Sequence, residues 1–272
     1  MCLETTHTHS HSHPVSRRAV LAGGAAAAVA TALPAPAHAV AARPRIADLT
    51  HTLTAGFPVY GLDAPARQTV LTIADHGVYV QNWTLGEHSG THVDVPGHFR
   101  GGGRLLPQIT PAELVGLPVA VVDISARVVS DPDTQVSVDD LIRYERTYGR
   151  IPRRAMVFMH SGWESRLPLG RAAYRGEDVS GGFHFPGWSA TAVAWLLERR
   201  GVSSVGVDTL SLDPGRSTTM DVHHLLLGDA DRIGLENVAH LGTLPPVGAT
   251  LTIGAIPLED GSGGPCRLLA TW

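Results

Sequence analysis

The chain has 272 residues, of which 43% are hydrophobic and 17% charged, with a formal net charge of −4. This composition is that of a globular protein and excludes a disordered or fibrous chain. The weak negative charge argues against nucleic-acid binding, and the 30 Gly and 19 Pro residues favour a turn-rich β or mixed fold over a helical bundle.

The first 39 residues have the features of a cleaved export signal. Arg17 and Arg18 form a twin-arginine pair, an alanine-rich apolar run continues to Leu33, and residues 37–39 form a small-x-small cleavage site. We therefore expect export by the twin-arginine route and cleavage after Ala39. The product would be a secreted or cell-envelope protein without a stable membrane anchor, whose residues 40–272 suit one domain.

The hydrophobic pattern of the remaining chain predicts many strands and two long helices. Strands are expected at residues 46–53, 69–74, 78–85, 118–125, 155–160, 202–207, 250–256 and 267–271. Helices are expected at residues 137–148, 189–200 and 218–227, with a helical turn at 110–114. No repeat or internal linker is visible, so the sequence predicts a single mixed α/β domain.

One eleven-residue stretch, from His88 to His98, carries the chemistry. His88, His92, Asp94 and His98 all fall at even positions, which share one face of an extended chain. A straight strand would hold His88 and His92 about 13 Å apart, but Gly90 permits a bend between them. The stretch is therefore predicted to form a compact loop whose imidazoles and carboxylate bind a divalent metal such as Zn, Mn or Fe.

A single loop does not complete a catalytic metal site, so further ligands are expected downstream. The candidates are His223, His224 and Glu236. The alternative interpretations are a helix with one solvated histidine for the His pair, and a helix N-terminal carboxylate for Glu236.

The pattern His-x-Gly-Thr-His-x-Asp-x-Pro-x-His, complete from His88 to His98, resembles the signature of the cyclase-like metal hydrolases. That family includes bacterial kynurenine formamidase and isatin hydrolase. The resemblance extends over essentially the whole mature chain, with supporting landmarks at residues 48–51, 161–163 and 205–208. It implies a single-domain, three-layer β/β/α swivelling fold and a homodimer.

The resemblance also implies roles for individual residues. His88, His92 and Asp94 would bind metal, a downstream His and Glu236 would add ligands, and His98 would transfer protons. The family spacing of twelve residues before the Glu selects His224, whereas alignment of the Leu-Leu-Gly segment selects His223. Both remain candidates, with a slight preference for His223, because an insertion is easier in a loop than in a helix.

These residues predict metal-dependent hydrolysis of an amide, N-formyl amine or lactam by a metal-activated water. The cofactor would be one or two divalent ions, with Zn or Mn preferred, and the partner a small-molecule substrate. His98 is the expected proton carrier. Candidates for lining a flat aromatic pocket are Phe57, Tyr60, Trp83, His160, Trp163 and Phe185.

Two other classes of function fit parts of the pattern. A non-haem iron oxygenase would use two histidines and one carboxylate, but His88 and Glu236 would crowd the positions that oxygen needs. An exported metal-binding module without catalysis would have a filled coordination sphere. Neither accounts for the whole set of candidate ligands as well as a hydrolase does.

Overall fold

A closed ring of seven strands forms the centre of the folded unit. The computed structural model describes residues 44–272. Around the ring the order is β12 (Gly263–Thr271), β11 (Val247–Ala255), β5 (Val115–Asp123), β7 (Met156–His160), β9 (Ser204–Val207), β10 (Gly234–Glu236) and β4 (His92–Asp94). β4 pairs with both β10 and β12 and so closes the barrel, and β1 (Ile46–Asp48) adds a further strand on β12.

Two apolar cores lie on opposite sides of the parallel strands β5, β7 and β9. Successive side chains of a strand point to opposite faces. Along β5, Val119 and Val121 pack into the barrel interior. Ala120 and Val122 pack on the other side, toward the helices. Because both faces are buried, these strands read as continuous apolar runs in the sequence, which is how they were predicted.

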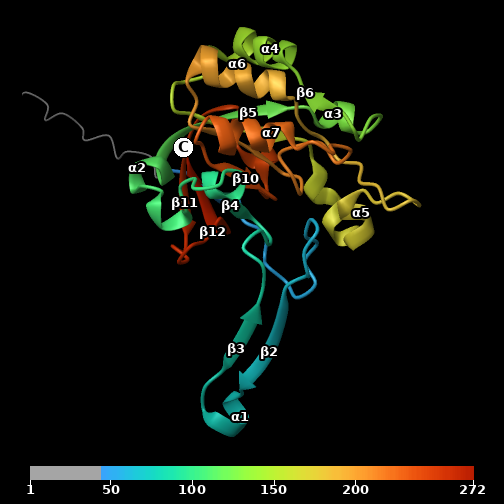
Figure 1. Cartoon of the computed structure of the whole chain (residues 1–272), viewed down its shortest axis with the longest axis vertical. Coiled ribbons are helices and arrows are strands. Elements are labelled where there is room, and N and C mark those ends of the chain that lie inside the picture. The colour runs from blue at the N-terminus through green and yellow to red at the C-terminus, as the bar shows by residue number, and fades with distance from the viewer. Residues whose placement is uncertain (1–43) are drawn as a thin grey trace, which may run out of the picture. The chain divides into compact units, whose positions relative to one another are not determined.

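Two long helices cover the outer side of these strands (Figure 1). Ser137 caps α4 (Val138–Tyr148) and Ser189 caps α6 (Ala190–Arg200), each with a side-chain oxygen that accepts a backbone N–H. Gly201 ends α6 at a φ of 62°, where a residue without Cβ has no steric cost. The resulting layers are helices and two halves of the barrel, which confirms the predicted α/β fold with its β/β/α arrangement.

The remaining elements are short. The α-helices are α1 (Ile73–His76), α2 (Pro111–Leu114), α3 (Ser125–Val128), α5 (Arg171–Arg175) and α7 (Asp221–His223). A π-helix, His224–Asp229, continues α7, and 3-10 helices form at Pro96–His98, Leu106–Gln108, Trp163–Leu169 and Leu241–Thr243. Two-stranded sheets are formed by β6 (Gln135–Val136) with β8 (Gly187–Trp188) and by β2 (Ala66–Leu71) with β3 (Val80–Thr84).

Several local predictions were wrong or incomplete. The strand expected at 46–53 ends at Asp48. The strand expected at 69–74 ends at Leu71, because Thr72 caps α1 by accepting the N–H of Asp75. The single helix expected at 218–227 is the short α7 followed by the wider π-turn. The strands β4 and β10 were not predicted, since each has only three residues and is held by tertiary pairing.

The hairpin of β2, α1 and β3, residues 66–84, is called the arm below. Figure 1 shows the arm extending away from the barrel, with α1 at its far end. Its two strands pair only with each other. The arm leads from residues 60–62 on one side directly to the His88 stretch on the other.

The predicted export signal, residues 1–39, lies outside the described residues. Within residues 44–272, no helix has the length and apolar character that a bilayer crossing needs.

Candidate metal centre

β4 places two candidate ligands on the wall of the barrel. Gly90 has a φ of 65°, and a Cβ there would lie 2.8 Å from Leu53 Cδ1, so both the bend and the close packing favour glycine. The Thr91 hydroxyl donates to the carbonyl of Asn237 at 2.6 Å, and β4 then pairs with β10 so that His92 lies opposite Glu236. The bend expected from the sequence therefore directs His92 and Asp94 toward Glu236.

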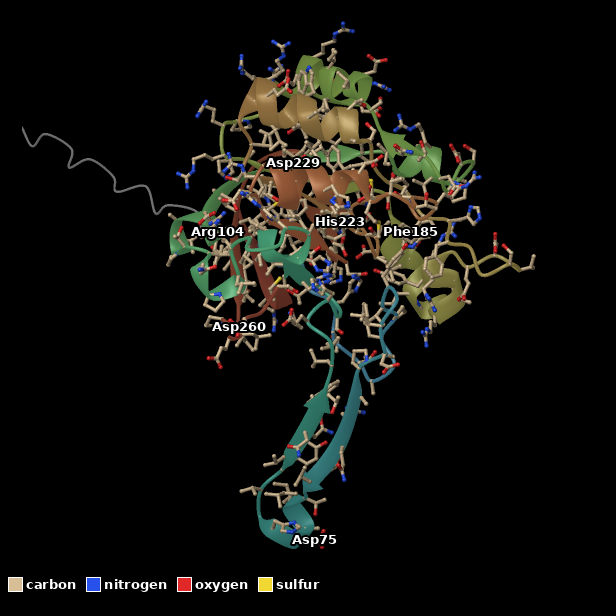
Figure 2. The ribbon with its side chains drawn as sticks, viewed as in Figure 1. Asp75, Arg104, Phe185, His223, Asp229 and Asp260 are labelled. Carbon is tan, nitrogen blue, oxygen red and sulfur yellow. The ribbon has the colours of Figure 1, made fainter. Side chains whose placement is uncertain are left out.

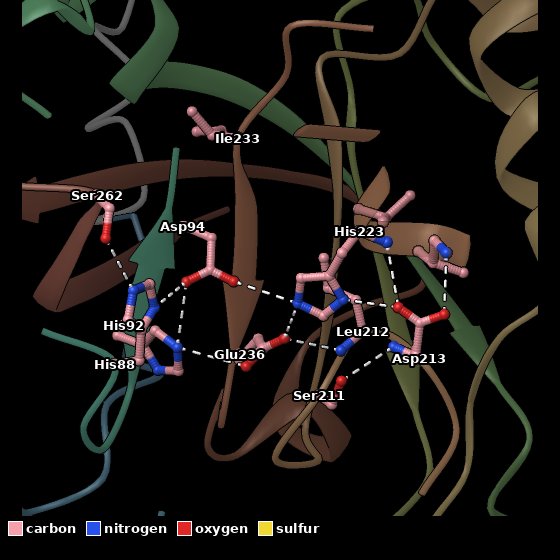
Figure 3. Close-up of polar contacts among 12 residues, drawn as sticks. His88, His92, Asp94, Ser211, Leu212, Asp213, His223, Ile233, Glu236 and Ser262 are labelled. Atoms are coloured by element: carbon pink, nitrogen blue, oxygen red, sulfur yellow. Dashed lines mark hydrogen bonds and ion pairs between the residues drawn. The ribbon is translucent and has the colours of Figure 1, made fainter. Parts of the chain in front are cut away.

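Five side chains converge here, four from β4, α7 and β10 and one, His88, from the turn before β4 (Figure 3). His88, His92 and Asp94 form one group of possible metal ligands, and Asp94, His223 and Glu236 form a second. His88 Nδ1 lies 2.6 Å from Asp94 Oδ1, and His92 Nε2 lies 3.3 Å from the same oxygen. His223 Nε2 lies 3.6 Å from the other oxygen, Oδ2, and 3.0 Å from Glu236 Oε1. Asp94 is thus shared by both groups.

Hydrogen bonds on the far side of each imidazole fix which nitrogen faces the carboxylates. His92 Nδ1 lies 2.9 Å from the Gly90 carbonyl, which can only accept, so this nitrogen carries the proton. His223 Nδ1 lies 2.6 Å from Asp213 Oδ2 and donates to it in the same way. In both rings Nε2 is the nitrogen left for a metal, and such outer partners orient metal-binding histidines in general.

In His88 the two ring nitrogens have the opposite roles: Nε2 donates a hydrogen bond and Nδ1 faces Asp94. The Ser262 hydroxyl donates to Glu87 Oε2 at 2.7 Å, so its oxygen accepts from His88 Nε2, which lies 3.2 Å away. The neutral ring then turns the lone pair of Nδ1 toward Asp94. A Cβ at Gly263 would lie 2.6 Å from the His88 ring, so only glycine at this position leaves room for the ring.

The cluster consists almost entirely of acceptors in a dry environment. His92, Asp94, His223 and Glu236 are all buried. Burial lowers the pKa of His92, but Asp94 and Glu236 outweigh this effect and raise it to about 10. Burial raises the pKa of Asp94, whereas the nearby imidazoles, His92 foremost, hold it well below its usual range. His92 Nε2 and Asp94 Oδ2 are buried without a hydrogen-bond partner. Such a cluster needs positive charge at its centre.

A cavity of about 210 Å³ opens beside this cluster. Its lining residues are Tyr60, Leu62, His88, His98, Phe99, Leu210, Ser211, Met220, His223, Glu236 and Asn237. The His98 ring stacks on His88 with 3.9 Å between ring centroids, and Phe99 lies 4.7 Å from His223. The cavity is therefore lined by two cluster imidazoles (His88 and His223), one cluster carboxylate (Glu236) and the imidazole of His98.

The structure decides between the two downstream histidines. His223 is buried in the cluster, whereas His224 is exposed and packs edge-on against Phe99 with 5.0 Å between ring centroids. Consecutive residues of a helix point about 100° apart, so one of the two must face away. His224 is therefore withdrawn as a candidate ligand, and the alternative placement of Glu236 at a helix start is wrong, because it ends β10.

Most of the residues predicted to line an aromatic pocket lie elsewhere, so that prediction was wrong. Only Tyr60 of the six candidates lines the cavity. Phe57, Trp163 and Phe185 are buried in the core under the helices, where their rings pack against other apolar side chains. Trp83 is on the arm, and His160 borders a different cavity near Asp123. Phe99, which was not a candidate, supplies the second ring of the cavity.

Asp213 supports the candidate ligand His223, and the sequence analysis did not identify it. Its carboxylate accepts the backbone N–H of Val222 at 2.9 Å and of His223 at 3.1 Å, and also the His223 ring. One buried side chain thus begins α7 and orients the imidazole that α7 carries. The only signal was a carboxylate ten residues before a histidine, which carries no recognisable pattern.

Comparison with known proteins agrees with this geometry. A family model described as "Putative cyclase" matches residues 47–214. The chain belongs to the Cyclase family. It is 32% identical to the isatin hydrolase of Roseibium aggregatum over 205 residues, which cover 72% of this chain and 76% of that protein. It is 30% identical to the kynurenine formamidase of Erythrobacter litoralis over 228 residues, covering 83% and 93%.

The fold of this Cyclase family member also matches solved structures of isatin hydrolases. An isatin hydrolase bound to the product analogue thioisatinate matches with a TM-score of 0.79 and 28% identity, covering 84% of this chain and 92% of that one. These relatives and the converging His, Asp and Glu side chains confirm the predicted class, a metal-dependent hydrolase of carbonyl–nitrogen bonds. The oxygenase and the non-catalytic module have no support among them.

Proposed function

We propose that the five converging side chains hold two divalent cations, Zn or Mn, with Asp94 as the shared ligand. His88 and His92 would complete one site, and His223 and Glu236 the other. The single observation that carries this proposal is the pair of overlapping ligand groups that meet at one buried carboxylate. Manganese and zinc both accept this set of imidazole and carboxylate donors.

The arrangement of the donor atoms supports two ions rather than one. Two buried carboxylates contribute two negative charges, and the neutral imidazoles contribute three nitrogen lone pairs. Asp94 uses one oxygen toward His88 and His92 and the other toward His223. A carboxylate whose two oxygens face different ligand groups could help to hold both cations, which would supply two-metal catalysis of hydrolysis.

We further propose that the substrate is a small lactam or N-formyl amine carrying an aromatic ring. The names of the relatives supply this chemical class, namely isatin hydrolase and kynurenine formamidase. The cavity supports it through its size and through the rings of Tyr60 and Phe99, which offer a flat apolar wall beside the cluster.

Bound cations would act as Lewis acids, lowering the pKa of a water and polarising the substrate carbonyl. The chain's own residues then provide the proton transfer. In hydrolysis the water oxygen bonds to the carbonyl carbon, the carbon–nitrogen bond breaks, and the nitrogen receives a proton. His98 is held against His88 at the cavity wall, and we assign to its imidazole the transfer from water to the leaving nitrogen.

The test is turnover of isatin and of N-formylkynurenine by metal-free protein and by protein reloaded with Zn or Mn. We expect activity on at least one substrate, only after reloading, at about two ions per chain, and unchanged under strict anaerobiosis. A metal-free protein with full activity, or one that requires oxygen, would contradict the proposal.

We also propose that the chain is exported by the twin-arginine route, with cleavage after Ala39, and works as a homodimer. The paired Arg17 and Arg18 and the apolar run behind them support export. N-terminal sequencing of protein recovered outside the cytoplasm is expected to begin at Val40. Recovery of uncleaved chain from the cytoplasm alone would contradict export.

A further inference from the structure

A second cavity, of about 310 Å³, lies at the carboxyl ends of the parallel strands β5 and β7, and we call it the outer cavity. Ligands commonly bind beyond the carboxyl ends of parallel strands. The other walls come from α4 and from the 3-10 helix Leu241–Thr243. Small-molecule sites typically have volumes of about 300–1,000 Å³, so the outer cavity suits a compound with one ring system.

The outer cavity is separate from the metal cavity. Within residues 44–272, none of the residues that line one of these cavities lines the other. α4 lies at the top of Figure 1, whereas Figure 2, drawn in the same view, shows His223 in the middle of the fold. A ligand in the outer cavity would therefore not touch the proposed metal ligands.

The ends of the two strands provide a negative charge. Asp123 and His160 are the last residues of β5 and β7 and lie opposite each other in register. Asp123 Oδ1 accepts the backbone N–H of Ser125 at 2.8 Å, and His160 Nδ1 lies 3.5 Å from Asp123 Oδ2. Burial raises the pKa of Asp123, but these contacts outweigh it and hold the pKa below its usual range. With 61% of its side chain exposed, the charged carboxylate remains accessible to a ligand.

Arg143 of α4 brings a positive charge to the same cavity. One of its nitrogens donates to Asp140 Oδ1 at 3.0 Å. Asp140 has closer partners, however, because Arg127 donates to both of its oxygens, at 2.6 and 2.8 Å. The charge of Asp140 is thus already compensated, and the Arg143 side chain is 66% exposed. A guanidinium group binds carboxylates through paired hydrogen bonds, so Arg143 is suited to an acidic group on a ligand.

Two tyrosines of α4 give the outer cavity an aromatic wall. Tyr144 and Tyr148 both line it, with 5.2 Å between ring centroids. The Tyr144 hydroxyl donates to the Pro246 carbonyl at 2.6 Å, which fixes that ring. Tyr148 is 48% exposed, so its ring is free to pack against a ligand, and the buried Leu241 and Leu244 add apolar surface. An aromatic ring in the cavity would therefore find both an aromatic partner and apolar contacts.

The combination of these groups argues against other kinds of ligand. Among residues 44–272, both groups of side chains with metal-binding spacing lie in the metal centre, so a cation has no such donor set here. A purely apolar compound would displace water from Asp123 and Arg143 without replacing its hydrogen bonds, which costs free energy. A compound with one charge would satisfy only one of the two. A zwitterion with an aromatic ring matches all three features.

We propose that the outer cavity binds an aromatic α-amino acid. Arg143 would bind the α-carboxylate, Asp123 the α-ammonium group, and Tyr148 the aromatic ring. This site goes beyond the proposed hydrolysis and does not depend on it, because none of the three residues belongs to the metal centre.

The first experiment is calorimetric titration of the metal-loaded full chain with L-tryptophan. We expect one site per chain with a Kd of about 1 mM or tighter. Arg143→Gln and Asp123→Asn should each weaken binding about 10-fold or more, since each removes a charged hydrogen-bond partner. The matched controls Arg146→Gln and Asp139→Asn remove the same charges from α4 outside the cavity and should change the Kd less than about twofold. Equal losses in a variant and its control would overturn the proposal.

Two analogues of L-tryptophan test which group binds where. Tryptamine lacks the carboxylate, and 3-indolepropionate lacks the ammonium group. Arg143→Gln should weaken the binding of 3-indolepropionate but not of tryptamine, and Asp123→Asn should do the reverse. If each variant weakened both analogues equally, the variants would act through the fold, and the assignment of the two charges would be overturned.

A third set of variants locates the ligand. Thr147→Trp places a ring inside the outer cavity and should abolish L-tryptophan binding with unchanged metal content and melting temperature. Its control is Thr191→Trp at an exposed position of α6, and Tyr60→Ala alters only the metal cavity, so both should still bind. Binding that survives Thr147→Trp, or a wild type that does not bind at about 5 mM, would overturn the proposal. None of these measurements involves turnover, so this proposal and the proposed function fail separately.

Discussion

The metal centre and the arm reverse the usual distribution of polarity in opposite ways. Around Asp94 the chain buries carboxylates and imidazoles in the wall of a barrel, and every ring has an outer hydrogen-bond partner. On the arm it exposes Ile73 and Tyr79 at 64% and 59%, on strands that pair only with each other. Each reversal costs stability unless something absent from the single chain compensates it.

The comparison teaches that the two regions lack different things. The centre lacks positive charge, and its geometry is fixed by contacts within the chain. Its side chains should therefore keep their positions whether or not metal is bound. The arm lacks a packing surface, and its geometry is fixed by few contacts, so its backbone should exchange hydrogens faster than that of the barrel. The predictions below separate these two kinds of dependence, from the largest expected effect to the smallest.

Asp94→Asn is expected to have the largest effect. Asparagine keeps the size of the side chain but removes the charge shared by both ligand groups, so turnover should fall roughly 10³-fold or more and metal content should drop. Elemental analysis and steady-state kinetics measure both. Normal metal content would show that Asp94 is not the shared ligand.

His223→Ala and His224→Ala form a matched pair one residue apart. The first removes a buried ring of the cluster, and we expect it to lose at least one ion and most activity. The second removes an exposed ring, so activity should stay within about twofold, as for most surface substitutions. Equal losses in the two variants would contradict the assignment of His223.

Asp213→Asn tests the support behind the metal centre. The single amide oxygen can replace Oδ2 and still accept from the backbone and ring of His223, but the Val222 N–H loses its acceptor Oδ1, and the charge behind the His223 ring is lost. Outer partners of metal-binding histidines are typically worth about 10–100-fold in metal affinity or activity. Titration of metal-free protein with zinc measures the affinity. An unchanged zinc affinity would make Asp213 only a helix cap.

Stability should depend on pH in opposite directions with and without metal. In the metal-free protein the pKa of His92 is raised to about 10, from an ordinary value of 6.5. This proton therefore stabilises the fold fully below about pH 6.5, and the contribution is lost as the pH rises toward 10. Metal needs the neutral ring, so its affinity rises over the same range. Thermal melts of both forms from pH 6 to pH 10 test this, and parallel curves would contradict it.

Gly77→Val is the matched perturbation of the arm and should have the smallest effect on the whole fold. A β-branched residue at a φ of 71° strains the end of α1 by about 1–2 kcal/mol. We expect faster hydrogen exchange in residues 66–84, while the metal content stays unchanged. A lower metal content would show that the arm and the centre are not independent.

The sequence predicted the frame of the molecule well because local signals specified it. Continuous apolar runs located β5, β7 and β9, and Ser137, Ser189 and Gly201 marked the ends of α4 and α6. The bend at Gly90 was predicted for the same reason, since the sequence itself shows a glycine between two candidate ligands.

Features that depend on tertiary contacts were not predictable. β4 and β10 are too short for a pattern and exist because they close the barrel. The choice of His223 over His224 depends on the rotation of α7, which Asp213 fixes across a turn. Whether a ring such as Trp163 lines a cavity or fills a core depends on the elements packed around it. The projecting arm left no sign beyond two ordinary strand patterns.

The most direct test is anomalous X-ray diffraction at the metal edge from crystals of the active, reloaded enzyme. The account predicts two ions per chain, both bonded to Asp94, one also bonded to His88 and His92 and the other to His223 and Glu236. Full activity in crystals whose ions lie elsewhere, or in which no ion touches Asp94, would contradict it.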